Sequence, residues 1–272
     1  MHGFLEIMVW PFLACLVLTG IHAYLGLHVI EREVIFVDLA LAQIAAFGGA
    51  MALAFGQGLE SGFSYGMSLG FTLLGAGVFS LTRFKKKRIP QEAFIGITYA
   101  VSAAALVMVL SRSGEGDEHI REMLVGNILL IHPAEVIKIL GIYSLIGLFH
   151  YVCRKRFLLI SQDPEEARKR GWSLHFWDFL FYASFGVVVT SSVKIAGVLL
   201  VFCFLIVPAA AAMLYSEKVQ SRLIFGWIFG VVASLAGIAV SYFLDFPTGA
   251  SVVCAFGALL LTLFFFKQFL QR

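Results

Sequence analysis

The chain has 272 residues, of which 60% are hydrophobic and 14% are charged, and its mean hydropathy is +0.91. A water-soluble domain of this size cannot bury so much apolar surface, so the composition excludes a soluble globular protein. The net charge of +3 does not indicate nucleic-acid binding, because the basic residues stand in short segments between apolar stretches, where they set membrane topology. We therefore predict an all-α, polytopic helical membrane protein with one transmembrane domain over residues 1–272.

Apolar stretches of about 20 residues, the length that crosses a bilayer, predict the transmembrane helices. In chain order they are residues 6–29, 34–56, 63–82, 91–111, 133–152, 174–192, 195–215, 222–244 and 248–268. Only a few residues around Lys194 separate the sixth stretch from the seventh. This pair forms either two full spans or one span with a broken helix, so the predicted count is eight or nine.

Basic residues cluster after the third, fifth and seventh predicted spans and at the end of the chain. If the spans alternate, all these clusters face one side, which the positive-inside rule makes the cytoplasm. The C-terminus is then cytoplasmic, and the N-terminus and the acidic loop 114–118 lie on the outer side of the membrane. Residues 112–132 are less apolar than the spans, and we predict that they form a short interfacial helix on the outer face.

The segment 157–173 is the one substantial stretch that this topology leaves in the cytoplasm. It contains a strong helix start, made of a capping residue, a proline at the first helical position and two acids in the first turn: Asp163, Pro164, Glu165 and Glu166. Cations at 168–170, followed by Gly171, predict where this helix ends. A short capped helix in this place is either a docking element for another protein or an ordinary surface helix.

The sequence contains no P-loop, no HExxH and no GxSxG motif, so we predict that the chain is not an enzyme. If ATP drives transport here, the ATPase must be another chain. The four cysteines lack metal-ligand spacing, and we expect free thiols and no permanently bound cofactor. The first residues, MHGFLEIMVW, have no basic n-region and no cleavage pattern, which predicts that there is no removable signal peptide.

The stretch from Arg32 to Met51 is an apolar helix that contains two polar residues, Asp38 and Gln43. Ionisable side chains at membrane depth usually face a bundle interior or a water-filled cavity, and they mark substrate pathways. We therefore predict that this helix forms the wall of a substrate pathway. The alternatives are a salt bridge from Asp38 to Arg32 or Lys194, and an interhelical hydrogen bond for Gln43.

Two further acids have structural interpretations. Glu92 opens the fourth predicted helix, where a negative charge complements the helix dipole. Asp178 and His175 stand near two tryptophans, and we interpret them as residues of the cytoplasmic membrane interface.

Six stretches resemble, in the same order along the chain, the membrane permease subunit of bacterial zinc/manganese-type ABC importers. They are Arg32 to Gly48; Gln91 to Ile97; Leu124 to Leu129 with His132 to Glu135; Asp163 to Gly171; Lys194 to Leu200 with Ile206 to Ala212; and Asp245 to Ala250. The fifth of these is the closest match, and together they cover nearly the whole chain.

The resemblance implies the permease subunit of an ATP-driven importer for zinc, manganese or iron, which forms the translocation pathway by alternating access. It also implies a second permease copy, as a homodimer or a heterodimer with a close relative, a cytoplasmic ABC ATPase and an extracytoplasmic metal-binding protein. The divalent metal is then the cargo. The ATPase would dock on the short cytoplasmic helix through Asp163, Pro164, Glu165, Glu166, Ala167 and Gly171.

The second helix departs from the pattern of that family, which has an Asp and, four residues later, a His on the same helix face. Leu39 and Gln43 occupy these positions here, and Asp38 comes one residue early, which turns it by about 100° around the helix. If the first two helices pair as an antiparallel hairpin, His22 lies level with Gln43. We predict a metal site of His22, Asp38 and Gln43, with a helix–helix hydrogen bond as the alternative for His22.

Because the expected pair is altered, other functions stay open. One is an ABC permease of the same fold for a non-metal or different substrate, and another is a stand-alone secondary transporter or channel. A stand-alone transporter needs no docking helix and often shows an inverted repeat, which we do not find in the sequence. If the predicted metal site is correct, His22→Ala and Asp38→Ala should each abolish uptake.

Overall fold

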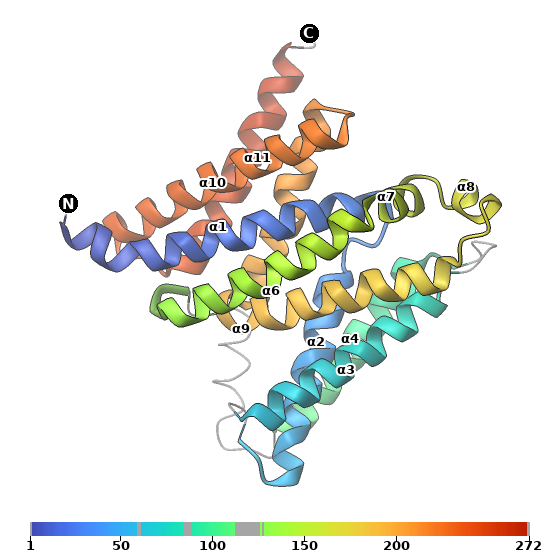
Figure 1. Ribbon diagram of the computed structural model, residues 1–272. Helices are drawn as coiled ribbons and strands as arrows, with labels where there is room; N and C mark the ends of the chain where they lie inside the picture. Colours follow the sequence, from blue (N-terminus) through green and yellow to red (C-terminus); the bar gives the residue numbers. More distant parts are fainter. Residues whose placement is uncertain (1, 59–60, 84–88, 112–125, 127, 271–272) are drawn as a thin grey trace. The chain divides into compact units, whose positions relative to one another are not determined.

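The computed structural model describes residues 2–58, 61–83, 89–111, 126 and 128–270 (Figure 1). In chain order its elements are α1 (His2–Glu31), α2 (Val37–Ala50), η1 (Met51–Phe55), α3 (Gly62–Leu81), α4 (Gln91–Leu110), η2 (Ile128–Leu130), α6 (Pro133–Val152), α7 (Arg154–Gln162), α8 (Pro164–Lys169), α9 (Leu174–Tyr215), α10 (Val219–Leu244) and α11 (Thr248–Leu270). The acidic loop 114–118 and most of the predicted interfacial helix lie outside the described residues, and the described end of that segment contains η2.

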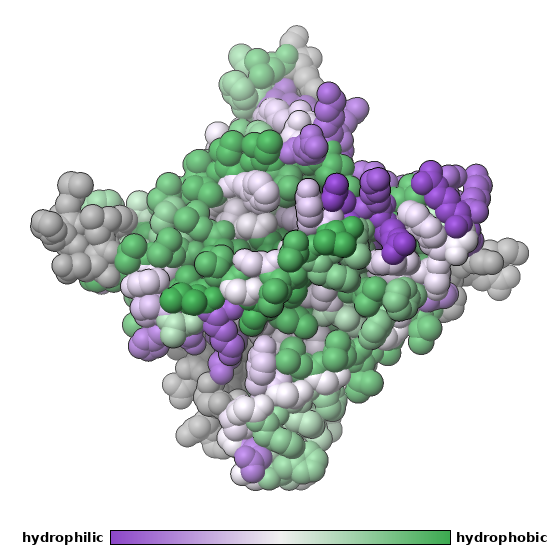
Figure 2. All heavy atoms as spheres, viewed as in Figure 1, coloured by the Kyte–Doolittle hydropathy of each residue, from purple (hydrophilic) through white to green (hydrophobic). Residues whose placement is uncertain are grey.

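Eight of the described helices are long and apolar enough to cross a membrane: α1, α2 with η1, α3, α4, α6, α9, α10 and α11. They coincide with the predicted spans to within a few residues at most ends. Figure 2 shows apolar residues over most of the visible surface, with hydrophilic residues gathered over α7 and α8. The prediction of an all-α polytopic membrane protein is confirmed.

Helix α9 contains the two predicted spans 174–192 and 195–215 in one run of 42 residues. The run is interrupted at Gly197, whose φ of 74° and ψ of 162° are not helical. Gly126, also at positive φ, packs against this break, and a Cβ on it would lie 2.2 Å from the carbonyl carbon of Ala196. Two glycines therefore permit the break, and at about 1.5 Å per residue α9 has enough residues for two crossings.

The chain forms two compact units, each made of separate chain segments. The first unit contains Met1–Ile30, Glu122–Gly147 and Ser192–Arg272, and the second contains Glu31–Arg121 and Leu148–Ser191. The helices α6 and α9 each contribute one part to either unit. The two units are described separately below.

In the first unit, α1 packs closely on the second part of α9. A Cβ on Gly26 would lie 1.8 Å from the carbonyl oxygen of Leu205, so only glycine permits this approach. Trp227 of α10 donates a hydrogen bond of 3.0 Å to the carbonyl oxygen of Gly20. The helices α10 and α11 pack along each other. Small residues at such contacts let helices associate in lipid, where burial from water gives no driving force.

In the second unit, α2 packs against both α3 and α4, as Figure 1 shows. Ser61 caps the start of α3 by accepting a hydrogen bond from the backbone N–H of Ser64. The Ser64 hydroxyl then donates to the carbonyl oxygen of Gly49 in α2, at 3.0 Å. On the other side of α3, the hydroxyls of Thr72 and Thr190 lie 3.2 Å apart and join α3 to the first part of α9. α2 is thus the central helix of this group.

Candidate functional site

Helix α2 begins with a cap that comes from another helix. The chain turns at Glu33, which has a positive φ of 58°, and Phe36 then occupies the N-cap position without a side-chain cap of its own. Instead, the backbone N–H of Phe36 donates a 2.9 Å hydrogen bond to Oε1 of Glu92 in α4. A carboxylate here also complements the positive end of the α2 dipole. Glu92 therefore stabilises the start of α2, in addition to standing in the first turn of its own helix.

The two predicted pathway residues of α2 are both buried. Asp38 is 2% exposed and Gln43 is 4% exposed. Oδ1 of Asp38 has no hydrogen-bond partner among the described residues, and the same is true of the buried Oε2 of Glu92. Glu92 accepts a hydrogen bond from the backbone N–H two residues before Asp38, so the carboxyl groups of Asp38 and Glu92 both lie at the start of α2. Unpartnered buried oxygens are rare and costly, so this pair needs an explanation.

A second acid of the same unit, Asp178 in α9, has two cationic partners, Arg32 and Arg83. Nη1 of Arg32 lies 2.5 Å from its Oδ1, and Nη1 of Arg83 lies 2.9 Å from Oδ1 and 2.8 Å from Oδ2. The Arg32 guanidinium also lies over the ring of Phe181, 4.1 Å from the ring centroid. In this ion triad of Arg32, Asp178 and Arg83, Arg32 and Asp178 are buried, with Asp178 at 0% exposure, and Arg83 is partly exposed.

The ion triad bears on two interpretations of the sequence. Asp178 is not an exposed anchor, because it is buried between two guanidinium groups. Arg32 pairs with Asp178, 146 residues away, and not with Asp38, which is six residues along the same segment. The alternative that Arg32 neutralises Asp38 is therefore wrong, and Asp178 has an ion-pairing role that the sequence interpretation did not include.

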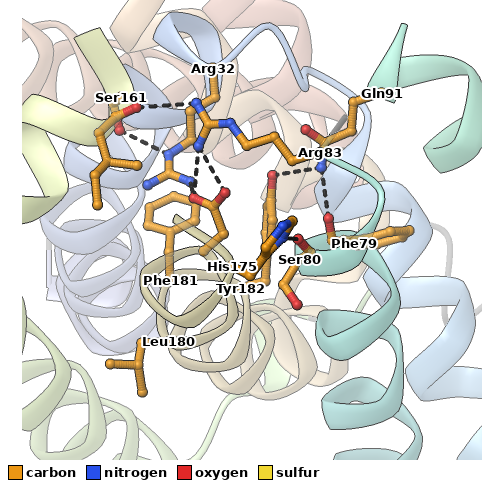
Figure 3. A network of polar contacts seen from close by, with 12 residues as sticks. Arg32, Phe79, Ser80, Arg83, Gln91, Ser161, His175, Leu180, Phe181 and Tyr182 are labelled. Atoms are coloured by element: carbon orange, nitrogen blue, oxygen red, sulfur yellow. Dashed lines mark hydrogen bonds and ion pairs between the residues drawn. The ribbon is translucent and has the colours of Figure 1, made fainter. Parts of the chain in front are cut away.

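Both arginines of the ion triad also hold α7. Nε of Arg32 donates to the hydroxyl of Ser161 at 2.8 Å, and Nη2 of Arg83 donates to the carbonyl oxygen of Ile160 at 3.2 Å. Figure 3 shows Ser161 beside Arg32, opposite the α3 residues Phe79 and Ser80. One buried carboxylate thus connects the start of the α2 segment, the end of α3, the helix α7 and the helix α9.

The predicted short helix is present as α8, and its start follows the expected rules. Oδ1 of Asp163 accepts a 2.9 Å hydrogen bond from the backbone N–H of Glu166, and Pro164 occupies the first helical position. Gly171 ends the segment with a positive φ of 77°. These features confirm the predicted cap and stop. The sequence interpretation did not separate out the preceding helix α7.

The segment α7–α8 is anchored on its inner side and open on its outer side. Ile160 and Ala167 are fully buried and form a small apolar cluster with Leu174. Trp177 belongs to this cluster, and the Arg156 guanidinium lies over its ring at 4.7 Å from the centroid. The exposed side chains of the segment and of the residue that follows it are Arg154, Lys155, Arg156, Gln162, Asp163, Glu165, Lys169 and Arg170. Ala167, in contrast, is buried against the apolar cluster.

A cavity of about 570 Å³ lies in the second unit, next to this segment. Its walls come from the turn before α2, the end of α3, the start of α4 and the segment α7–α8. Four acids line it: Glu31, Glu33, Glu92 and Glu165. The arginines on its wall include the two of the ion triad, whose charges face Asp178. Carboxylates on the wall make the cavity suitable for a cation.

His22 lies in the first unit, where both of its ring nitrogens are engaged. Nδ1 lies 2.8 Å from the carbonyl oxygen of Leu18, which can only accept, so Nδ1 carries the proton. Nε2 therefore accepts from the hydroxyl of Ser192 at 3.3 Å, and that oxygen lies 2.5 Å from the hydroxyl of Tyr143. This polar chain of Tyr143, Ser192, His22 and Leu18 is the helix–helix hydrogen bonding that was the alternative for His22.

The structure therefore treats the three predicted metal ligands differently. Asp38 and Gln43 are together on α2, and Asp38 has an unpartnered oxygen. His22 belongs to the other unit and already has two hydrogen-bond partners. In the described ranges, no three His, Cys, Asp or Glu side chains gather as a metal-binding group. The residue that sequence reasoning missed beside Asp38 is Glu92, and its only signal was an acid at the start of an apolar helix.

Together the fold and these sites define a class, that of polytopic membrane proteins with polar groups inside the helical core and a helical segment between spans. The chain belongs to the ABC 3 transport family, which residues 4–267 match. The resemblance found in the sequence is thereby confirmed.

Two named transport proteins are similar in sequence to parts of this chain. The manganese transport system membrane protein MntC of Listeria monocytogenes is 29% identical over 190 residues, which are 68% of this chain and 64% of that protein. The chelated iron transport system membrane protein YfeD of Yersinia pestis is 27% identical over 169 residues, 62% of this chain and 57% of that protein. In both cases the matched part spans less than two thirds of the relative.

The fold is also that of a solved structure. A chain of PsaBC from Streptococcus pneumoniae, solved in complex with Fab, has a TM-score of 0.80 to this chain at 22% identity. The match covers 97% of this chain and 95% of that chain. At this level of identity the comparison shows the fold alone.

Proposed function

We propose that the chain is the transmembrane permease subunit of an ATP-driven importer for a divalent metal ion. The observation that carries this proposal is the buried carboxylate of Asp38, which has an oxygen without a partner among the described residues and lies on the helix that we predict to form the wall of the substrate pathway. A buried acid inside a span has a functional role by default, because its burial is costly. The names of the relatives, which are manganese and iron transport proteins, support a metal as the cargo.

The partners and the orientation follow from the same proposal. A cytoplasmic ABC ATPase docks on the exposed face of the segment α7–α8, where Asp163, Glu165 and Arg170 are accessible. A second permease copy completes the pathway, and an extracytoplasmic metal-binding protein delivers the ion to the outer face. The C-terminus is cytoplasmic and the N-terminus lies outside, as the distribution of basic residues predicts.

Of the predicted cargo ligands, Asp38 and Gln43 are supported best, because they lie on one buried helix. Their oxygen atoms suit manganese or ferrous iron better than zinc, which prefers nitrogen and sulfur ligands. The cargo is written here as substrate, so the pathway holds it in passing and needs no permanent metal.

Reconstitution tests the proposal. The chain is expressed together with a candidate ABC ATPase and a candidate metal-binding protein from the same organism, and the complex is placed in liposomes. We expect ATP-dependent uptake of ⁵⁴Mn²⁺, and ATPase activity that rises when the binding protein carries manganese. Loss of the exposed acids, in the variant Asp163→Ala with Glu165→Ala, should weaken assembly with the ATPase. If neither Mn²⁺, Fe²⁺ nor Zn²⁺ is taken up or stimulates the ATPase, the metal assignment is wrong, and a permease for another substrate takes its place.

A further inference from the structure

Asp38 and Glu92 form a pair of acids whose placement the fold fixes from both sides. Asp38 stands in the first turn of α2 and Glu92 in the first turn of α4, and these two helices pack along each other. Oε1 of Glu92 is fixed by the backbone N–H of Phe36 at 2.9 Å, which leaves Oε2 as its second oxygen. The Glu92 carboxylate is therefore held beside the start of α2 even without a ligand.

One oxygen on each acid lacks a partner. Oδ1 of Asp38 and Oε2 of Glu92 are buried, and no described residue donates a hydrogen bond to either. The three arginines on the cavity wall are already paired, Arg32 and Arg83 with Asp178 and Arg168 with Glu165. Two neighbouring carboxyl groups that have no counter-charge among the described residues require either a shared proton or a bound cation.

We propose that Asp38 and Glu92 together bind the transported divalent cation at the start of α2. This inference rests on the proposed function and replaces His22 with Glu92 as the ligand that accompanies Asp38. Carboxylate oxygens are hard ligands, so the site takes manganese or ferrous iron in preference to zinc. Glu92 also lines the acidic cavity, together with Glu31 and Glu33. A cation that leaves the pair therefore has an acid-lined space beside it.

Direct binding of MnCl₂ to the full-length chain in lipid nanodiscs tests the site without ATPase or binding protein. Electron paramagnetic resonance of free Mn²⁺ measures the affinity. Asp38→Asn and Glu92→Gln should each weaken Mn²⁺ binding at least tenfold, and the double variant should bind no better than the weaker-binding single variant. The matched control is Glu135→Gln, which removes one acid near the start of α6, where its carboxylate accepts from the backbone N–H of His132. This control should leave Mn²⁺ affinity unchanged.

A ligand exchange keeps the test decisive if the amide variants are poorly folded. A thiolate is a soft ligand, so Asp38→Cys should lower Mn²⁺ affinity and raise Cd²⁺ affinity at least tenfold. Equal Mn²⁺ affinity in the wild type, Asp38→Asn and Glu92→Gln would mean that the pair holds only a proton, and the inference would be overturned. It would also be overturned if the wild type did not bind Mn²⁺. The proposed function fails by a different result, which is intact Mn²⁺ binding without ATP-dependent uptake by the reconstituted complex.

Discussion

Two buried aspartates of the same unit have opposite surroundings. Asp178 is 0% exposed and receives two guanidinium groups, whereas Asp38 is 2% exposed and has an oxygen without a partner. Arg32 is close to Asp38 in the sequence, yet its charge goes to Asp178. The fold thus provides hydrogen-bond partners for both carboxylate oxygens of Asp178, whereas Oδ1 of Asp38 has no partner among the described residues.

This difference separates a structural role from a functional one. A buried charge with its partners in place connects helices, and removing one member leaves the others uncompensated. A buried acid that lacks a partner contributes no such connection and is retained at a cost. The polar chain at His22 also has a structural role by this criterion, because its members form hydrogen bonds with one another.

The largest expected effect is at Asp178. Asp178→Ala leaves the buried Arg32 and the partly exposed Arg83 without a counter-charge, and should reduce the free energy of unfolding by about 3–5 kcal/mol. Thermal unfolding of the purified chain in detergent, followed by tryptophan fluorescence, measures the loss. As a control, Glu217→Ala changes an exposed acid between α9 and α10 and should have little effect. If Asp178→Ala were as stable as the wild type, Asp178 would have no structural role, and the contrast with Asp38 would be wrong.

At Asp38 the effect should fall on transport. Asp38→Asn should reduce ATP-dependent Mn²⁺ uptake by about 100-fold, which corresponds to about 2.7 kcal/mol, because it removes a charged ligand of the cargo. Its thermal stability should equal or exceed that of the wild type, since a neutral amide is less costly to bury than an unpartnered carboxylate. Uptake in proteoliposomes and thermal unfolding are measured on the same preparation. A variant that is both unstable and active would contradict this assignment.

A substitution at His22 tests whether the polar chain of Tyr143, Ser192, His22 and Leu18 has only a structural role. His22→Ala removes the partner of the Ser192 hydroxyl and of the Leu18 carbonyl, and should cost about 1–3 kcal/mol in unfolding free energy. If the polar chain is only structural, variants that fold should retain uptake within a few-fold of the wild type. Complete loss of uptake in a folded His22→Ala protein would instead support the ligand role that the sequence predicts.

The smallest effect concerns the cap of α8. Asp163→Ala removes the side chain that accepts from the backbone N–H of Glu166, which should cost about 1 kcal/mol of local stability. Hydrogen exchange of the α8 amides measures this loss, and Asp163→Asn, which keeps an acceptor, should restore most of the protection. Equal protection in the alanine variant would show that the buried Ala167 is sufficient to hold the helix.

The features that could be predicted from the sequence are those that depend on residues close together in the chain. The spans follow from runs of apolar residues, and the start and end of α8 follow from Asp163, Pro164 and Gly171. The choice of partners did not follow, because Arg32 and Asp178 are 146 residues apart and no local pattern connects them. A signal was nevertheless present, since Asp178 is a single acid among aromatic residues in an apolar helix. Glu92 was assigned to its own helix dipole, whereas the structure shows it capping α2.

The double attachment of α7 has a mechanical consequence. Arg32 and Arg83 each contact both α7 and Asp178, through Ser161 and the carbonyl of Ile160. Two arginines that contact the same carboxylate restrict both the translation and the rotation of α7, whereas one arginine would still permit rotation. A displacement of α8 would therefore be passed on through α7 to the start of α2, which Arg32 precedes.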